Sequence, residues 1–293
     1  MLINAQNLKD LQVMVNTQFA AGKLEAAAQG AAIATFLKSG SSKTTYPDFS
    51  QWPGFRKWVG DRQFKDMSKA TYTIENETFE SSVEISREDI EDDNLGFLAH
   101  IAKATGQATI THADEILFPL LQAGFTNKCH DGKTFFAEDH VGADGATQSN
   151  LLGGSAANPW FLLDTTKVIK PLIFQTRRDY NLTSKINLND DNVFNQNAFQ
   201  WGVDARVAAG YGPYMTAIGA KVGLDATAYA EARRMFGEMK SPEGRPYRTV
   251  GNLMVVGPAL EAAARELLKA ERTTGGKSNI WNGTCELLVV PYL

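Results

Sequence analysis

The spacing of apolar residues near the N-terminus predicts a helix with little core of its own. Leu8, Leu11 and Val15 recur at helical intervals, and the Ala-rich stretch 20–34 continues the helical pattern despite two glycines. Residues 39–45 are small and polar, which is typical of a connector. Such an arm offers few large apolar side chains, so we expect them to be covered by something else, with another subunit as one candidate.

A period of two appears after residue 70 and predicts strands. Residues 79–85 alternate, with Phe79, Val83 and Ile85 on one face and polar side chains on the other. Residues 72–74 alternate in the opposite phase, so we expect a turn or bulge at 75–77 and a two-stranded hairpin. Residues 75–93 hold nine acidic side chains and one basic one. That charge suits either a solvated face or contact with a basic surface on a neighbour.

The longest predicted helix begins near Leu95 and ends near residue 123. Apolar residues keep helical spacing over 97–108 and again over 116–121. Residues 91–94 are suited to cap its start, and Gly124 is suited to end it. Up to Pro119 this helix would be about 36 Å long at 1.5 Å per residue.

The rest of the chain alternates between loop-like and strand-like composition. Residues 126–158 and 187–197 are rich in glycine, aspartate and asparagine, which predicts loops. The runs 160–163, 168–174 and 199–208 are typical of strands. From residue 224 the pattern becomes a compact α/β unit, with a helix at 225–240, a strand at 253–256, a helix at 259–270 and a strand at 286–290.

Composition and charge narrow the class of protein. The 293 residues are 43% hydrophobic and 21% charged, which is ordinary for a globular chain. The formal net charge of −4 argues against a protein that grips nucleic acid by its phosphates. No stretch of eighteen apolar residues occurs, and the N-terminus does not resemble a secretory signal. Two distant cysteines, Cys129 and Cys285, argue against a disulfide scaffold and favour a reducing compartment.

Residues 46–61 are unusually aromatic. Trp52 and Trp58 bracket Arg56 and Lys57, an arrangement that allows cation–π or stacking contacts. The plainer interpretation is a small satellite core, which the many aromatic rings of this segment would also fill.

No motif in the sequence makes a convincing catalytic or metal site. Residues 274–278 end like a phosphate-binding loop but lack its first glycine and follow a predicted helix. Cys129, His130 and His140, with Asp131 and Asp139, match no common zinc spacing, and a Cys–His dyad would need the fold to bring its members together. His112 and Glu115 lie one helical turn apart, which favours a surface hydrogen bond. The residue pattern therefore favours an assembly protein over an enzyme.

Seven segments carry a resemblance to a known family. They include WPGFRKWVGDR at 52–62, CHDG at 129–132 and VVGPALE at 255–261. The others fall within 79–93, 114–126, 161–175 and 202–212, so the resemblance covers nearly the whole chain. Together they resemble the major head proteins of Mu-like phages, the gpT family, which has the Hong Kong 97-type major capsid fold.

The resemblance implies an α+β capsid subunit with four parts: an N-terminal arm (1–45), an extended loop built as a β-hairpin (46–92), a peripheral domain with a spine helix (93–216) and an axial domain (217–293). In many shells of this fold the axial domain precedes the closing strands of the peripheral domain. Here the segment that resembles those strands, 199–212, comes first, which implies a permuted order.

The resemblance also implies a function and partners. Hexamers and pentamers of the chain would form an icosahedral shell around double-stranded DNA held by confinement only, in a virion assembled in the host cytoplasm. Scaffold, portal and decoration proteins would be further partners, with no membrane, cofactor, metal or catalytic residue. The residues expected at contacts between subunits are Trp52, Arg56, Trp58, Glu80, Glu84 and Arg87.

Two other functions are compatible with the residue pattern. A bacterial nanocompartment shell of the same fold would enclose an enzyme in place of DNA. A cysteine-dependent hydrolase would use Cys129 with His130 or His140.

Overall fold

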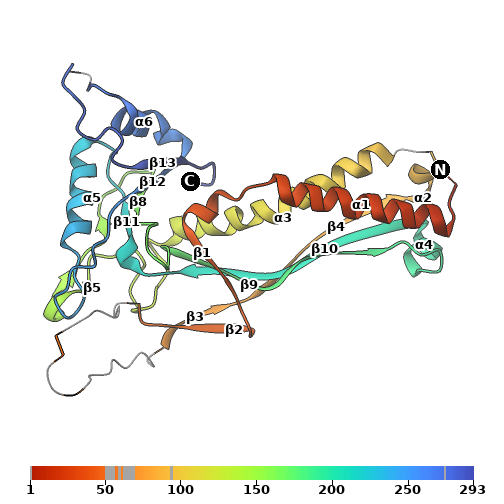
Figure 1. Cartoon of the computed structure of the whole chain (residues 1–293), viewed down its shortest axis with the longest axis horizontal. Coiled ribbons are helices and arrows are strands. Elements are labelled where there is room, and N and C mark those ends of the chain that lie inside the picture. The colour runs from red at the N-terminus through yellow and green to blue at the C-terminus, as the bar shows by residue number, and fades with distance from the viewer. Residues whose placement is uncertain (1, 50–56, 59–60, 62–69, 93–94, 274) are drawn as a thin grey trace.

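The computed structural model describes residues 2–49, 57–58, 61, 70–92, 95–273 and 275–293. Figure 1 shows an elongated part, in which two long helices lie along a long sheet, and a compact part at one end of it. The N-terminus lies at the far end of the elongated part, and the C-terminus lies near the junction of the two parts. Within the described residues, no helix combines the length and apolarity needed to cross a membrane.

The N-terminal arm forms helix α1 (Ala5–Glu25), which begins where the Asn4 side chain accepts a hydrogen bond from the Asn7 backbone N–H at 2.8 Å. The predicted continuation through residue 34 is wrong. Asp114 accepts hydrogen bonds from the backbone N–H groups of Gln29 (3.0 Å) and Gly30 (2.6 Å). These bonds hold residues 29–32 in a single 3₁₀ turn, and strand β1 (Ala34–Lys38) follows.

The apolar face of α1 is covered by other elements of the same chain and not by another subunit, the candidate considered from the sequence. Leu8, Leu11 and Val15 are buried in a cluster with Leu98 and Trp201. Leu98 lies on helix α3 (Leu95–Ala123), which has the predicted length, contains Pro119 and ends directly before Gly124. Residues 93–94, within the predicted cap, lie outside the described residues.

The elongated part is built on a four-stranded sheet in the order β1-β9-β10-β4. Strands β9 (Leu172–Lys185), β10 (Ala198–Tyr211) and β4 (Glu77–Ser86) are antiparallel, and β1 runs parallel to β9. The predicted alternation of β10 is confirmed, since its odd-numbered residues from 199 to 207 are buried. Strand β9 continues to Lys185, eleven residues beyond the predicted end at Phe174. Within this extension, Arg178 forms an ion pair with Asp204 of β10.

The hairpin predicted from residues 72–85 does not form. Strand β3 (Ala70–Glu75) pairs with β2 (Lys43–Pro47), whereas β4 pairs with β10. The predicted break between the two phases is real and is centred on the buried Asn76. Its side-chain amide donates hydrogen bonds to Ser39 Oγ (3.0 Å), Ser41 O (2.9 Å) and Ser42 O (3.3 Å) and accepts one from Gln175 Nε2 (2.9 Å). At Asn76 the chain therefore leaves the β2–β3 sheet and enters the long sheet, and it does not form a hairpin turn.

The compact part contains a five-stranded sheet in the order β13-β12-β8-β11-β7. Its strands are β7 (Leu151–Leu152), β8 (Trp160–Leu163), β11 (Ala217–Ala220), β12 (Leu253–Val256) and β13 (Glu286–Val289), with helices α5 (Ala226–Glu238) and α6 (Glu261–Lys269) beside it. Asp225 caps α5 as predicted, accepting from the N–H groups of Thr227 and Ala228.

The chain enters this sheet twice. Strand β8 pairs with both β11 and β12, although β9 and β10 lie between β8 and β11 in the sequence. A domain boundary at residue 217 would therefore assign the strands of one sheet to two domains. Along the chain, β9 and β10 lie between the first two strands of this sheet and the last three, so the compact part includes residues before 217.

The remaining described elements are short. Helices α2 (Arg87–Glu91) and α4 (Asp191–Gln196) lie toward the far end of the elongated part, and strands β5 (His140–Val141) and β6 (Thr147–Gln148) pair in the compact part. Three further single turns are η2 (Ala143–Gly145), η3 (Tyr214–Thr216) and η4 (Pro258–Leu260).

Candidate functional site

The residues expected at contacts between subunits lie in two regions. Trp52 and Arg56 lie outside the described residues, and the neighbouring Trp58 is 67% exposed. Glu80 and Glu84 are exposed on β4, and Arg87 begins α2 directly after it. The structure therefore groups the last three along one strand and its end.

These three charged side chains have contacts within their own chain. Glu80 accepts a hydrogen bond from Ser82 Oγ at 2.7 Å, and Glu84 accepts one from Gln200 Nε2 at 2.7 Å. Arg87 Nε lies 2.9 Å from Glu91 Oε1. Exposed contacts of this kind hold a side chain weakly, so the three charges can still take part in another interface.

Strand β4 is an edge of its sheet. Among the described residues it pairs only with β10, so the hydrogen-bonding groups on its other side face away from the sheet. Such an edge is a template for pairing with another chain, and charged side chains restrict which partner is accepted. Glu77, Glu80 and Glu84 give this edge a negative charge.

The strands β2 and β3 flank residues 50–69 and pack onto the long sheet. Tyr46, Phe49 and Ile74 are buried against Ile173 and Ala208, and the Tyr46 hydroxyl donates to Gln175 Oε1 at 3.1 Å. The satellite core suggested by the sequence is therefore present for residues 46 and 49. Its position on the long sheet was not foreseen.

A second contact ties this segment to the compact part. Asp48 Oδ1 lies 3.0 Å from Nδ1 of the buried His130, and the ring of Phe49 meets the His130 ring edge-on at 5.3 Å between centroids. These residues are about eighty positions apart, so no local sequence signal marks the pair.

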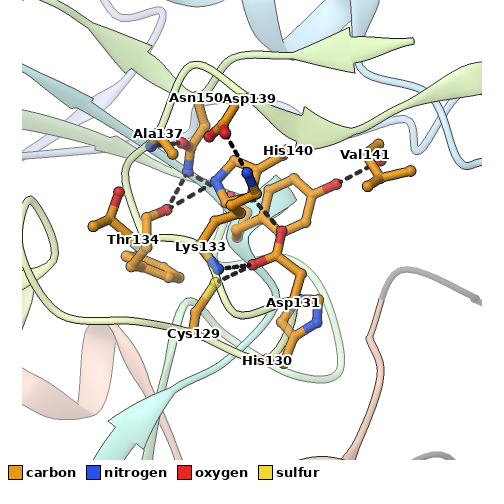
Figure 2. A network of polar contacts seen from close by, with 12 residues as sticks. Cys129, His130, Asp131, Lys133, Thr134, Ala137, Asp139, His140, Val141 and Asn150 are labelled. Carbon is orange, nitrogen blue, oxygen red and sulfur yellow. Dashed lines mark hydrogen bonds and ion pairs between the residues drawn. The ribbon is translucent and has the colours of Figure 1, made fainter. Parts of the chain in front are cut away.

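The loop after α3 gathers Cys129, Asp131 and His140 (Figure 2). Cys129 Sγ donates to Asp131 Oδ1 at 3.2 Å, and His140 Nδ1 lies 2.6 Å from Asp131 Oδ2. The His140 ring stacks on Tyr214 with 3.7 Å between centroids, which fixes its orientation. These residue types are evident in the sequence, but the fold supplies their arrangement around one carboxylate.

This arrangement does not suit a cysteine nucleophile. Burial and the neighbouring Asp131 charge raise the pKa of the Cys129 thiol, which keeps it protonated. Burial acts to raise the pKa of Asp131, but the hydrogen bond and charge of His140 outweigh it and lower that pKa to about 2. A carboxylate of that pKa is a poor base for a thiol proton, and the Cys129 thiol donates to Asp131 and not to a histidine nitrogen. The geometry contradicts the Cys–His dyad of the hydrolase interpretation.

His112 lies in a groove between α3 and the long sheet. Its Nδ1 is 2.5 Å from the Tyr180 hydroxyl, and its ring meets Phe79 edge-on at 4.6 Å. The predicted surface hydrogen bond to Glu115 is therefore wrong, because Tyr180 from the facing strand β9 reaches the ring instead. Burial lowers the pKa of His112, while the charge of Glu115 acts in the opposite direction.

Comparison with known proteins gives consistent similarities over the whole chain. The family model described as Mu-like prophage major head subunit gpT matches residues 8–293. The chain is 33% identical to the major capsid protein of Escherichia phage Mu, with 100% of both chains covered. It is 35% identical to the Mu-like prophage FluMu major head subunit of Haemophilus influenzae, over 90% of this chain and 89% of the relative.

Solved structures agree with the sequence relatives. The chain is similar to the procapsid subunit of bacteriophage JBD30, with a TM-score of 0.90, 32% identity and coverage of 99% of this chain and 100% of that one. The capsid of the same phage matches with a TM-score of 0.81, 25% identity and 91% of both chains covered. A JBD30 capsid decorated with minor capsid protein trimers matches with a TM-score of 0.74, 26% identity, and 92% of this chain and 91% of that one covered.

Proposed function

Because the chain belongs to the Mu-like prophage major head subunit family, gpT, and is the major capsid protein of a Mu-like tailed phage, we propose that its copies close into an icosahedral shell of hexamers and pentamers around double-stranded DNA. The observation that carries this proposal is the TM-score of 0.90 to a procapsid subunit over 99% of the chain. Both the elongated and the compact part fall within that coverage.

The acidic edge of β4 is the proposed contact with a neighbouring copy. Glu80, Glu84 and Arg87, together with Trp52, Arg56 and Trp58 of the extended loop, form the proposed contact set. The opposite side of the same sheet offers a complement, since Lys38 at the end of β1 and Arg177 on β9 are exposed. Complementary charges on opposite edges favour a fixed register between copies.

The two parts of the molecule fit two roles in such a shell. The compact part, including β7 and β8 as well as residues 217–293, is the proposed axial unit around fivefold and sixfold centres. The long sheet with α1 and α3 is the proposed peripheral unit. Since α1 is packed on its own chain, the contribution of the arm to neighbours rests on its exposed residues, such as Leu2 and Leu24.

The proposed cargo and partners follow from charge and from the relatives. A net charge of −4 suits a shell that confines DNA without clamping it. A minor capsid protein decorates the JBD30 capsid, and we extend a partner of that kind to this chain, together with scaffold and portal proteins. We place the chain in the virion, after assembly in the host cytoplasm, and assign it no enzymatic activity.

Nuclease protection tests the cargo. Particles produced in infected or induced cells are treated with nuclease, and the protected nucleic acid is sized. We expect double-stranded DNA of genome length inside particles that sediment as closed shells. Particles that protect an enzyme and no DNA would instead support the nanocompartment alternative.

A further inference from the structure

The Cys129, Asp131 and His140 cluster has the chemistry of a metal site. The thiol sulfur, a carboxylate oxygen and a ring nitrogen all lie within 4.8 Å of one another. The Cys129 and His140 side chains are buried, and the Asp131 side chain is 12% exposed. Sulfur, nitrogen and carboxylate oxygen are the donor types that bind Zn²⁺ in proteins.

The local backbone is organised to converge on Asp131. Residues 128–134 form a tight turn closed by an antiparallel bridge between Lys128 and Thr134, with Gly132 at a φ of 81°. The Lys133 backbone N–H donates to Asp131 Oδ1 at 3.0 Å, which orients the carboxylate. Cys129 and Asp131 therefore project from one turn toward His140 on β5 (Figure 2).

The hydrogen bonds of His140 show why a cation fits. Its Nδ1 faces the Asp131 carboxylate at 2.6 Å, and its Nε2 faces the Phe135 carbonyl oxygen at 3.3 Å. Both partners are acceptors, whereas a neutral imidazole has only one N–H to donate. A neutral ring that donates from Nε2 to Phe135 leaves the Nδ1 lone pair directed at the Asp131 carboxylate, which is where a metal ion would bind. In metal sites the second ring nitrogen of a ligating histidine commonly donates to a backbone carbonyl, as Nε2 can do here.

We propose that Cys129 Sγ, the Asp131 carboxylate and His140 Nδ1 bind one divalent transition-metal ion of the Zn²⁺ class. Binding replaces the thiol proton of Cys129, which leaves to solvent, and His140 binds through Nδ1 while its ring proton stays on Nε2. The Asp131 carboxylate and the new thiolate together offset the +2 charge of the ion. The thiolate ligand selects against Mg²⁺ and Ca²⁺, which prefer oxygen.

Binding requires the three ligand atoms, which lie within 4.8 Å of one another, to settle at tetrahedral spacing, with the sulfur about 3.5 Å from Nδ1. Tetrahedral ligands about 2.0–2.1 Å from zinc are separated by about 3.3 Å, so the Nδ1–Oδ2 distance must widen by about 0.7 Å. The fourth position goes to a water molecule on the side where Asp131 is partly exposed. The bound ion would join the 128–134 turn to β5, directly beside the His130–Asp48 contact that ties down the segment entering residues 50–69.

Metal analysis of the full-length protein tests this site. The protein is incubated with Zn²⁺, dialysed and measured for zinc by mass spectrometry, beside Cys129→Ser, His140→Gln and the control Cys285→Ser. Cys285 is also a buried free thiol, but it lies apart from the cluster. We expect one zinc per chain for the wild type and the control. The two ligand variants should bind zinc more weakly by at least the 10- to 100-fold that loss of an outer partner typically causes.

A second measurement does not depend on the variants folding. Co²⁺ added to the wild type should give the absorption band of a thiolate–cobalt bond, and Zn²⁺ should raise its melting temperature by mass action. A wild type that keeps no zinc, or a cobalt spectrum without the thiolate band, would overturn the proposal in favour of a metal-free hydrogen bond between His140 and Asp131. Zinc that stays bound equally in Cys129→Ser and His140→Gln would overturn it as well. These outcomes are independent of whether the chain assembles.

Discussion

At the scale of single residues, two glycines set how closely α1 approaches α3. A Cβ atom added at Gly106 would lie 2.2 Å from the Phe19 carbonyl oxygen, and one added at Gly22 would lie 2.0 Å from the Lys103 carbonyl oxygen. Both obstacles are backbone atoms, so they cannot rotate away. The absence of a side chain at each position is therefore a packing requirement, which a single sequence does not reveal because a glycine there only weakens the helical pattern.

The substitution Gly106→Ala should separate the two helices. We expect it to lower the free energy of unfolding by about 1–3 kcal/mol, the usual cost of overpacking. Gly237→Ala in α5 is the matched control, because a Cβ atom there meets nothing within 4 Å. The control should be neutral or gain up to about 1 kcal/mol in helix propensity. Urea unfolding measures both, and an equal effect of the two substitutions would contradict this account of the crossing.

His112 should make stability depend on pH. Its pKa in the folded chain is lowered by burial, so the unfolded chain binds more protons as the pH falls below about 6.5. Stability from this group is therefore present at neutral pH and lost on acidification. Replacing His112 by Gln should flatten the melting temperature profile between about pH 7 and 5. His100→Gln, exposed on the same helix, is the control, and an unchanged slope in His112→Gln would refute the assignment.

Residue types were easier to predict than residue partners. Cys129, His130 and His140 stand out in the sequence, yet the aspartates that face them include Asp48, which lies 82 positions before His130. His112 was assigned to Glu115 on its own helix, but the facing strand supplied Tyr180. Long-range pairs of this kind depend on tertiary packing, which leaves no periodic signal in a single sequence.

At the scale of elements, amphipathic periodicity identified most of the long segments. Helix α3, strand β10 and the strands and helices after residue 224 formed close to where they were predicted, because each buries one continuous face. The predicted elements were wrong where a side chain forms hydrogen bonds to distant backbone groups, or where the chain moves from one sheet to another. Asp114 ends the N-terminal helical region early, and Asn76 separates β3 from β4.

Removing the Asn76 side chain should loosen the connection between the two sheets. Asn76→Ala removes one hydrogen-bond partner each from the buried Gln175 amide, the Ser39 hydroxyl and the Ser41 carbonyl, at a cost of about 1–3 kcal/mol. Hydrogen exchange should become faster in β2 and β3 before it does in β10. Asn16→Ala is the control, since Asn16 makes an exposed hydrogen bond on α1. Uniform exchange across all strands in Asn76→Ala would show that the residue has no such local role.

At the scale of the whole molecule, non-local strand pairing limited what the sequence could predict. Strands β7 and β8 are two and four residues long, and they join strands more than fifty positions later. Strands this short carry little pattern, so the sequence pattern indicated a compact α/β unit only from residue 224. The resemblance to a capsid family identified the protein class, while the expectation of an uncovered arm failed because α3 already covers it.

Charge reversal on the edge strand should separate assembly from folding. Changing both Glu80 and Glu84 to Lys places like charges against the proposed basic edge, which costs several kcal/mol at an interface. We expect far fewer particles in sedimentation while the melting temperature of the free subunit changes little. Asp10→Lys on α1 is the control. Adding Lys38→Glu and Arg177→Glu should restore particles, and a normal particle yield from the first double variant would contradict the edge contact.

The most direct test of the central claim is a cryo-electron microscopy map of particles assembled from the full-length chain. The account predicts closed icosahedral shells in which the β4 edge of each copy contacts another copy and the compact parts cluster at fivefold and sixfold centres. A protein that stays monomeric under every assembly condition, or a shell in which β4 faces only solvent, would contradict it.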